Sequence, residues 1–172
     1  FPVVKARLFD FDIVHACHYS SYGAVPATLA PSPGTVAEVA LTYLDQDQLA
    51  RMHETELSGR RYVYGLLGQI RVQPEGLAAR NAVHSYWTGY GYFAGPSGPL
   101  ALSAIAAEGR RFAAAAQEDM QIQARDRLAP GRDMHDFVHE NIADPGLRHE
   151  RSLALSANAK PFDHPHCQIL DG

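Results

Sequence analysis

The sequence predicts a single α+β domain over residues 1–172, with strands early in the chain and helices late. Three observations lead to this prediction. Residues 1–112 alternate short apolar segments with turns rich in Pro and Gly, residues 113–172 contain mostly helical patterns, and neither a linker nor a repeat separates them. We therefore expect a small mixed or antiparallel sheet, or a barrel, with helices and with a helical C-terminal extension packed on it.

Composition and charge narrow the class of protein. The formal net charge is -4 and the pI is near 6.1, whereas nucleic-acid-binding domains carry a basic surface, so we expect no nucleic-acid partner. The chain has no apolar run of about 18 residues, which favours a protein without a membrane span. Cys17 and Cys167 lie far apart, as expected for reduced thiols in a cytoplasmic protein.

The first half of the predicted sheet contains two strands. Arg7–Tyr19 reads as the first strand and is followed by a polar turn, Ser20–Gly23. Pro26–Thr35 contains three prolines and a glycine and is expected to form a loop. Val36–Leu44 is rich in β-branched and aliphatic residues, so it is the second expected strand.

A short helix should follow this strand. Asp45 and Gln48 have the spacing of a capping box, in which each side chain satisfies a free backbone N–H group of the other residue. At about 100° per residue, Glu56 returns to within about 20° of Leu49 on the helical wheel, whereas Glu54 lies roughly 140° away. The pattern places Glu56 on the apolar face and Glu54 in water.

The remaining elements are one strand, one hairpin and two helices. Arg61–Val72 reads as a strand, and Asn81–Ile105 reads as a hairpin that turns at Gly95–Gly98. Helical patterns cover Ala113–Ala129 and, after a Pro-Gly break, Asp133–Ala143, which Asp133 would cap. The histidine-containing segment Asp163–Cys167, near the C-terminus, is expected to be irregular.

An acid on an apolar helix face requires an explanation, because a buried carboxylate is costly unless it is paired or used in chemistry. One interpretation is structural and gives Glu56 an ion pair with Arg51, Arg60 or Arg61. The other is functional and gives Glu56 a catalytic or ligand-contacting role.

The segment from Val36 to Val72 resembles the γ-glutamyl cyclotransferase-like family, and the strand Ala82–Trp87 resembles it more weakly. Members run a strand into a short helix that contains an acid, followed by a strand that contains a tyrosine. In this sequence the family positions are occupied by Leu44, Leu49, Met52, His53, Glu56 and Tyr62. His53 stands where the family has an aspartate, and Leu57 stands where it has a glycine.

The resemblance implies a cyclotransferase or amidohydrolase that acts on a γ-glutamyl or similar small amide. Glu56 would be the acid-base residue, and a carboxylate can both accept and return a proton. The loop Tyr22, Gly23, Ala24 and Val25 would hold an anionic group of the substrate with its backbone amides, although Ala24 replaces the usual serine. His18 is expected to face the same cavity as Tyr22 and Glu56, and Tyr62 is expected to contact the substrate. The chemistry needs no cofactor and no metal.

Two alternatives stay open. A non-catalytic small-molecule-binding or scaffold domain of the same fold would account for the departures at Ala24 and Leu57. A metal-dependent hydrolase comes third, because His135 and His139 have the i, i+4 spacing that places two imidazoles on one helix face. The helical extension after about residue 113 could be a lid, the surface of a homodimer or added core.

Overall fold

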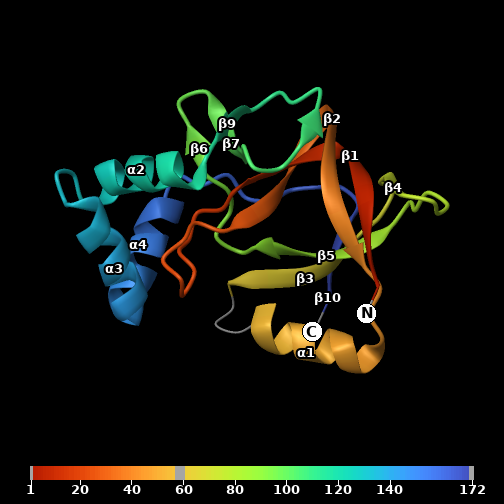
Figure 1. Ribbon diagram of the computed structural model, residues 1–172, viewed down its shortest axis with the longest axis horizontal. Coiled ribbons are helices and arrows are strands. Elements are labelled where there is room, and N and C mark those ends of the chain that lie inside the picture. Colours follow the sequence, from red (N-terminus) through yellow and green to blue (C-terminus); the bar gives the residue numbers. More distant parts are fainter. Residues whose placement is uncertain (1, 57–60, 171–172) are drawn as a thin grey trace.

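The structure is a computed structural model that describes residues 2–56 and 61–170. Its longest elements are two adjacent strands, β1 (Val3–His15) and β2 (Ala27–Thr42), which pair antiparallel from Val3 opposite Thr42 to His15 opposite Ala27. Figure 1 shows this long hairpin curving through the middle of the molecule. Three further strands of the described chain pair directly with this hairpin.

Five short strands extend the hairpin into a larger sheet. They are β4 (Val72–Pro74), β6 (Ala94–Gly95), β7 (Gly98–Leu102), β8 (Ala107–Glu108) and β9 (Ala113–Ala115). The strand order is β6-β7-β1-β2-β8, with β4 paired to β1 and β9 to β7. The β7–β9 pair is parallel and the others are antiparallel, so this sheet is mixed.

A second, antiparallel sheet has three strands. β3 (Tyr62–Leu67) lies between β5 (Val83–Thr88) and β10 (Cys167–Leu170), so the end of the described chain pairs with its middle. Leu8 and Phe11 of the larger sheet share a core with Leu67 and Trp87 of the smaller one. The two sheets are therefore held together by buried apolar side chains.

The described part of the chain also contains four helices. They are α1 (Gln46–Glu56), α2 (Gln117–Leu128), α3 (Met134–Ala143) and α4 (Pro145–Ser156). Helices α2 to α4 gather at one end of the molecule, and α1 lies apart from them below β3 (Figure 1). Helices α2 to α4 share a second buried core with the segment that follows β1, formed by Cys17, Tyr19, Val25, Phe93, Met120, Ala124, Phe137 and Leu155. None of the helices in the described residues has the length and apolarity to cross a membrane.

The α+β class and the helical extension are confirmed, whereas the barrel alternative is wrong because the strands form open sheets. The expected loop Pro26–Thr35 is also wrong, since most of it belongs to β2. Pro31 pairs with Phe11, and Pro33 lies in the register shift between Phe9 and Phe11, where the backbone of Asp10 adopts a left-handed φ of 65°. A β-bulge accommodates proline inside a long strand.

Other boundaries differ from the sequence prediction. The expected strand Arg61–Val72 is broken by Gly68 and by Gln69, which has a φ of 51°, so β3 and β4 join different sheets. The turn Gly95–Gly98 is confirmed, but β5 pairs with β3 instead of β7. Ala113–Ala115 is a strand, and the helix begins only at Gln117.

Candidate functional site

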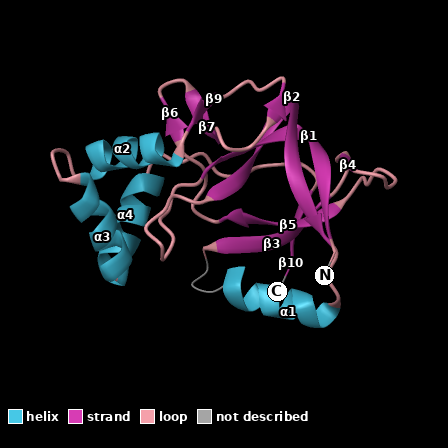
Figure 2. Ribbon diagram, viewed as in Figure 1, coloured by secondary structure: helices cyan, strands magenta, loops and turns pink. Residues whose placement is uncertain are grey.

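Helix α1 begins as its capping signal predicts. The Asp45 carboxylate accepts a hydrogen bond from the backbone N–H of Gln48 at 2.8 Å, and the Gln48 side chain accepts one from the backbone N–H of Asp45 at 3.0 Å. Leu49 and Met52 are half-buried on the inner side of the helix, while Glu54 is exposed, as the helical wheel predicts. The helix lies beside the smaller sheet (Figure 2).

Aromatic and polar side chains cover one face of this sheet. The register pairs Tyr62 with Thr88 and Tyr64 with Tyr86. Because side chains alternate along a strand, these four share one face, while Trp87 lies on the other face in the buried core. The smaller sheet therefore has one apolar face against the larger sheet and one phenol-rich face.

Two phenol–imidazole pairs occupy this face. The hydroxyl of Tyr86 is hydrogen-bonded to Nδ1 of His53 at 2.8 Å, and the hydroxyl of Tyr64 to Nδ1 of His84 at the same distance. The His53 ring meets the Tyr64 ring edge-on at 4.5 Å, which links the two pairs. Burial raises the pKa of both phenols, that of Tyr86 to about 12, so both keep their protons at neutral pH.

Glu56 is the last residue of α1 and is half-buried. Burial is the main cause that raises the pKa of Tyr62 to about 12, and the negative charge of Glu56 is the second cause. The same charge also contributes to the raised pKa of Tyr86. The charge of the Glu56 carboxylate therefore acts on both phenols. No ion pair joins Glu56 to Arg51 or Arg61 within residues 2–56 and 61–170.

Leu57, which stands at the family's glycine position, and Arg60, a predicted ion-pair partner of Glu56, lie outside the described residues.

His18 follows β1 and is only 1% exposed. Its Nδ1 is hydrogen-bonded to the hydroxyl of Thr88 at 3.0 Å, and its ring contacts those of Tyr62 and Tyr90 at centroid distances of 5.4 and 5.3 Å. Burial, and then the positive charge of Arg61, lowers the pKa of His18 to about 4. His18 is thus a neutral imidazole packed behind Tyr62, and three predicted site residues, His18, Tyr62 and Glu56, form one cluster.

The loop Tyr22–Val25 is closed by its own backbone. Gly23 N–H donates to the carbonyl of Ser20 at 3.0 Å, and Ser20 N–H donates to the carbonyl of Ala24 at 2.8 Å. The N–H of Tyr22 donates to the Ser20 hydroxyl at 3.3 Å, while the Tyr22 side chain is 84% exposed. The amides of Tyr22 and Gly23 therefore already have acceptors within the loop.

The same loop packs on the helical extension. Gln121 donates to the carbonyl of Gly23 at 2.6 Å, and Gln117 donates to that of Val25 at 3.1 Å. Gly23 has a φ of +71°, and a Cβ atom there would lie 2.9 Å from Cγ1 of Ile142. The described residues show no hydrogen bond or ring contact between this loop and Glu56 or Tyr62. The structure brings together Glu56, Tyr62 and His18, and it places the loop against another part of the molecule.

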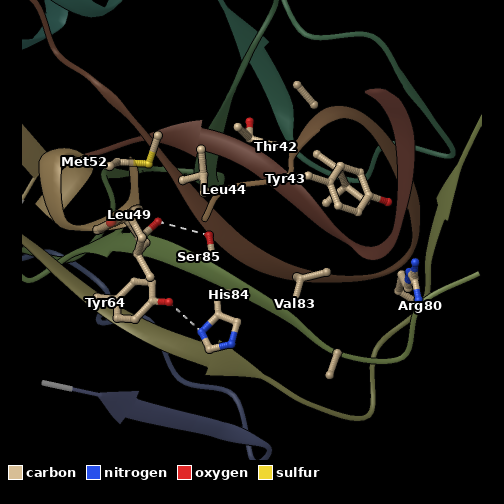
Figure 3. A pocket seen from close by; sticks show the side chains of 14 residues that line it. Thr42, Tyr43, Leu44, Leu49, Met52, Tyr64, Arg80, Val83, His84 and Ser85 are labelled. Carbon is tan, nitrogen blue, oxygen red and sulfur yellow. Dashed lines mark hydrogen bonds between the residues drawn. The ribbon is translucent and has the colours of Figure 1, made fainter. Parts of the chain in front are cut away.

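A pocket of about 400 Å³ adjoins the phenol-rich face, between the end of β2, α1 and β5 (Figure 3). Its lining residues are Ala40, Leu41, Thr42, Tyr43, Leu44, Leu49, Met52, Tyr64, Arg80, Ala82, Val83, His84, Ser85 and Tyr86. Tyr86 both lines the pocket and is coupled to Glu56, so it connects the two features.

Sequence reasoning missed Tyr64, Arg80, His84 and Tyr86. The alternation of Tyr62 and Tyr64 signals a shared strand face, and His84 and Tyr86 alternate in the same way. What the sequence does not give is the pairing of β3 with β5, which brings the two sets together.

The histidines of α3 lie far along the chain from this pocket. His135 and His139 have parallel rings with centroids 6.3 Å apart, as their spacing predicts. Ligand atoms of Asp133, His135 and Asp136 lie within 4.8 Å of one another, but all three residues are exposed. The Asp133 carboxylate also caps α3 by accepting from the N–H of Asp136 at 3.1 Å. A structural role thus accounts for one member of this set.

Comparison of the chain with protein-family models, curated proteins and solved structures gives no match in any of the three. The resemblance to the γ-glutamyl cyclotransferase-like family therefore stays a prediction. The class that the fold and site define is an α+β protein with a small-molecule-sized pocket next to a carboxylate–phenol cluster.

Proposed function

We propose that this chain is an enzyme of cyclotransferase or amidohydrolase type that acts on a γ-glutamyl or similar small amide, with Glu56 as its acid-base residue. The observation that supports the proposal is the negative charge of Glu56 acting on the phenols of Tyr62 and Tyr86, the second of which lines a pocket of about 400 Å³. A carboxylate near phenol groups and a pocket is a composition that acid-base sites use.

In the proposed reaction the α-amine of a γ-glutamyl group attacks its own side-chain carbonyl. Glu56 removes a proton from the α-ammonium group, and the amine nitrogen then forms a new C–N bond with the carbonyl carbon. As the tetrahedral intermediate collapses, the original amide C–N bond breaks, Glu56 returns its proton to the leaving amine, and the extra proton on the ring nitrogen passes to solvent. The products are a cyclic 5-oxoproline and a free amine. This sequence of steps needs no cofactor.

Tyr86 is the best placed group to stabilise the developing oxyanion. Its high pKa keeps the phenol protonated through neutral pH. When His53 donates its Nδ1 proton to the phenol oxygen, the phenolic proton is free to point into the pocket. A preorganised donor aimed at a developing negative charge lowers the barrier of acyl transfer.

The test is product analysis. The purified protein is incubated with a panel of γ-glutamyl amides, and the products are identified by proton NMR. Release of 5-oxoproline supports cyclotransfer, and release of glutamate supports hydrolysis. Glu56→Gln should abolish either product while Glu54→Gln, an equal charge change on the exposed side of the same helix, should leave it. Absence of both products across the panel overturns the proposal.

The second candidate is a non-catalytic small-molecule-binding domain. It is favoured by the pocket lining, which contains Tyr86 but not Glu56. In this case ligands would bind to the wild-type protein and to Glu56→Gln with equal affinity, and neither protein would convert them.

A further inference from the structure

The pocket beside α1 is amphipathic along its length. Leu44, Leu49 and Met52 line one end, and Figure 3 shows Arg80 at the opposite end with Val83 between them. Of the described residues that line the pocket, Arg80 is the one with a formal charge, and none is a carboxylate. A ligand that matches this lining has an apolar body and one anionic group.

Arg80 is anchored at its backbone. Its N–H donates to the carbonyl of Val72 at 2.7 Å, and its carbonyl accepts from the N–H of Val72 at 2.9 Å. Val72 is 1% exposed and belongs to the core between the sheets. Within the described part of the chain Arg80 has no ion-pair partner. Its backbone is fixed in this way, and its exposed guanidinium group can bind a carboxylate with two parallel hydrogen bonds.

His84 provides a second donor to the same pocket. Its ring stacks on Tyr64 with centroids 5.3 Å apart, and the hydrogen bond between Nδ1 and the Tyr64 hydroxyl fixes its orientation. Tyr64 keeps its proton because burial raises its pKa, so it can donate to Nδ1. His84 then carries its own proton on Nε2, which is available to an anion.

We propose that this pocket binds a carboxylate that has an apolar body. Arg80 recognises the carboxylate, and the side chains of Leu44, Leu49 and Met52 contact the apolar body. A ligand whose charged group is an ammonium alone should bind more weakly, because Arg80 repels it and the lining offers no carboxylate to pair with it. The volume of about 400 Å³ lies within the range of small-molecule sites, roughly 300–1,000 Å³. This binding goes beyond the proposed function, since it requires neither Glu56 nor turnover.

The experiment is an NMR titration of the ¹⁵N-labelled protein with three ligands that share one chain: hexanoate, hexanamide and hexylamine. Hexanoate should shift the amide signals of Arg80, Val83, His84 and Tyr86 in a saturable way. Hexanamide and hexylamine should bind at least roughly tenfold more weakly, as expected for losing one charge-assisted hydrogen-bond pair. Acetate, which cannot reach the apolar end, should also bind more weakly than hexanoate.

Variants separate the pocket from general charge effects. Arg80→Gln should weaken hexanoate roughly tenfold without changing the affinity for hexanamide. Arg111→Gln, the same change at an exposed arginine outside the pocket, should leave both affinities unchanged. Equal binding of hexanoate and hexanamide, equal binding of acetate and hexanoate, or equal losses in the two variants would each overturn the proposal.

The titration is repeated with Glu56→Gln. If the wild-type protein binds hexanoate but turns over no γ-glutamyl amide, the proposed function is refuted and the pocket proposal stands. Turnover by a wild-type protein that does not bind hexanoate supports the proposed function and refutes the pocket proposal.

Discussion

Single residues set the chemistry around the site, and His18 is the clearest case. Its imidazole is buried against Tyr62 and Tyr90 and titrates near pH 4 in the folded protein, compared with about 6.5 in the unfolded chain. The unfolded state therefore binds a proton that the folded state does not bind in this window. The contribution of the buried neutral His18 to the free energy of unfolding is fully present above about pH 6.5 and is lost as the pH falls towards 4.

We predict that His18→Gln will flatten this part of the stability profile. The wild-type protein should lose on the order of 3 kcal/mol between pH 6.5 and 4 from this residue, whereas the variant should not show that loss. Urea unfolding at closely spaced pH values measures the slope. His139→Gln, at an exposed histidine, should keep the wild-type slope. Identical slopes for wild type and His18→Gln would contradict the burial argument.

Gly65 provides a second prediction at this scale. A Cβ atom at this position would lie 2.2 Å from the Trp87 ring and 2.5 Å from the carbonyl of Gln168, so β3 can approach both neighbours only with glycine here. Gly65→Ala should lower the free energy of unfolding by about 1–3 kcal/mol through overpacking. In Gly68→Ala the new Cβ would be 3.5 Å from its nearest neighbour, and the stability should change by less than about 1 kcal/mol. Thermal unfolding compares the two.

At the scale of elements, one ion pair fastens β1 to the segment between β8 and β9. Arg110 binds the carboxylate of Asp12 through two hydrogen bonds of 2.9 and 3.0 Å, and the Asp12 side chain is fully buried. Arg110→Ala would leave a buried charge without its partner and should cost about 3–5 kcal/mol. Arg111→Ala removes an adjacent exposed arginine and should cost less than about 0.5 kcal/mol. Chemical denaturation that gives equal losses would refute this role for Arg110.

The sequence predicts elements well where a local signal exists. Asp45 with Gln48, and Asp133, mark the starts of α1 and α3, and the hydrogen bonds that they imply are present. The sequence-based prediction fails where pairing with a distant strand determines the secondary structure. Residues 167–170 become a strand because β3 offers them a free edge, and Ala113–Ala115 pairs with β7 although alanine favours helices.

The same distinction applies to the site. Helical periodicity brings Glu56 towards the sheet, and alternation puts Tyr62 on the face that meets it. The loop at Tyr22 could not be placed from sequence, because its position depends on contacts with Gln117 and Gln121 almost a hundred residues later in the chain. Long-range contacts of this kind leave no local pattern.

At the scale of the whole molecule, β1 connects two buried cores. Leu8 and Phe11 belong to the core between the sheets, while Cys17 and Tyr19, just after the strand, belong to the core under the helices. A continuous chain segment that enters both cores should make the sheets and the helical extension unfold together.

We predict one cooperative transition. Met120 is fully buried in the helical core, so Met120→Ala should cost about 2–5 kcal/mol, whereas Ile122→Ala, on the exposed side of the same helix, should cost much less. Trp87, the single tryptophan, reports on the sheet core by its fluorescence. The fluorescence midpoint should shift together with the helical circular-dichroism signal. A shift of the helical signal alone would mean that the two parts unfold independently.

The central claim is that Glu56 transfers protons during cleavage of a small amide. The most direct measurement is kcat/KM of the wild type, Glu56→Gln and Glu54→Gln for the γ-glutamyl amide that releases most 5-oxoproline. We predict that Glu56→Gln will lower kcat/KM at least about 100-fold, as expected for loss of a general acid-base group, and that Glu54→Gln will leave it within about twofold. Equal values for the two variants would contradict the assignment of Glu56.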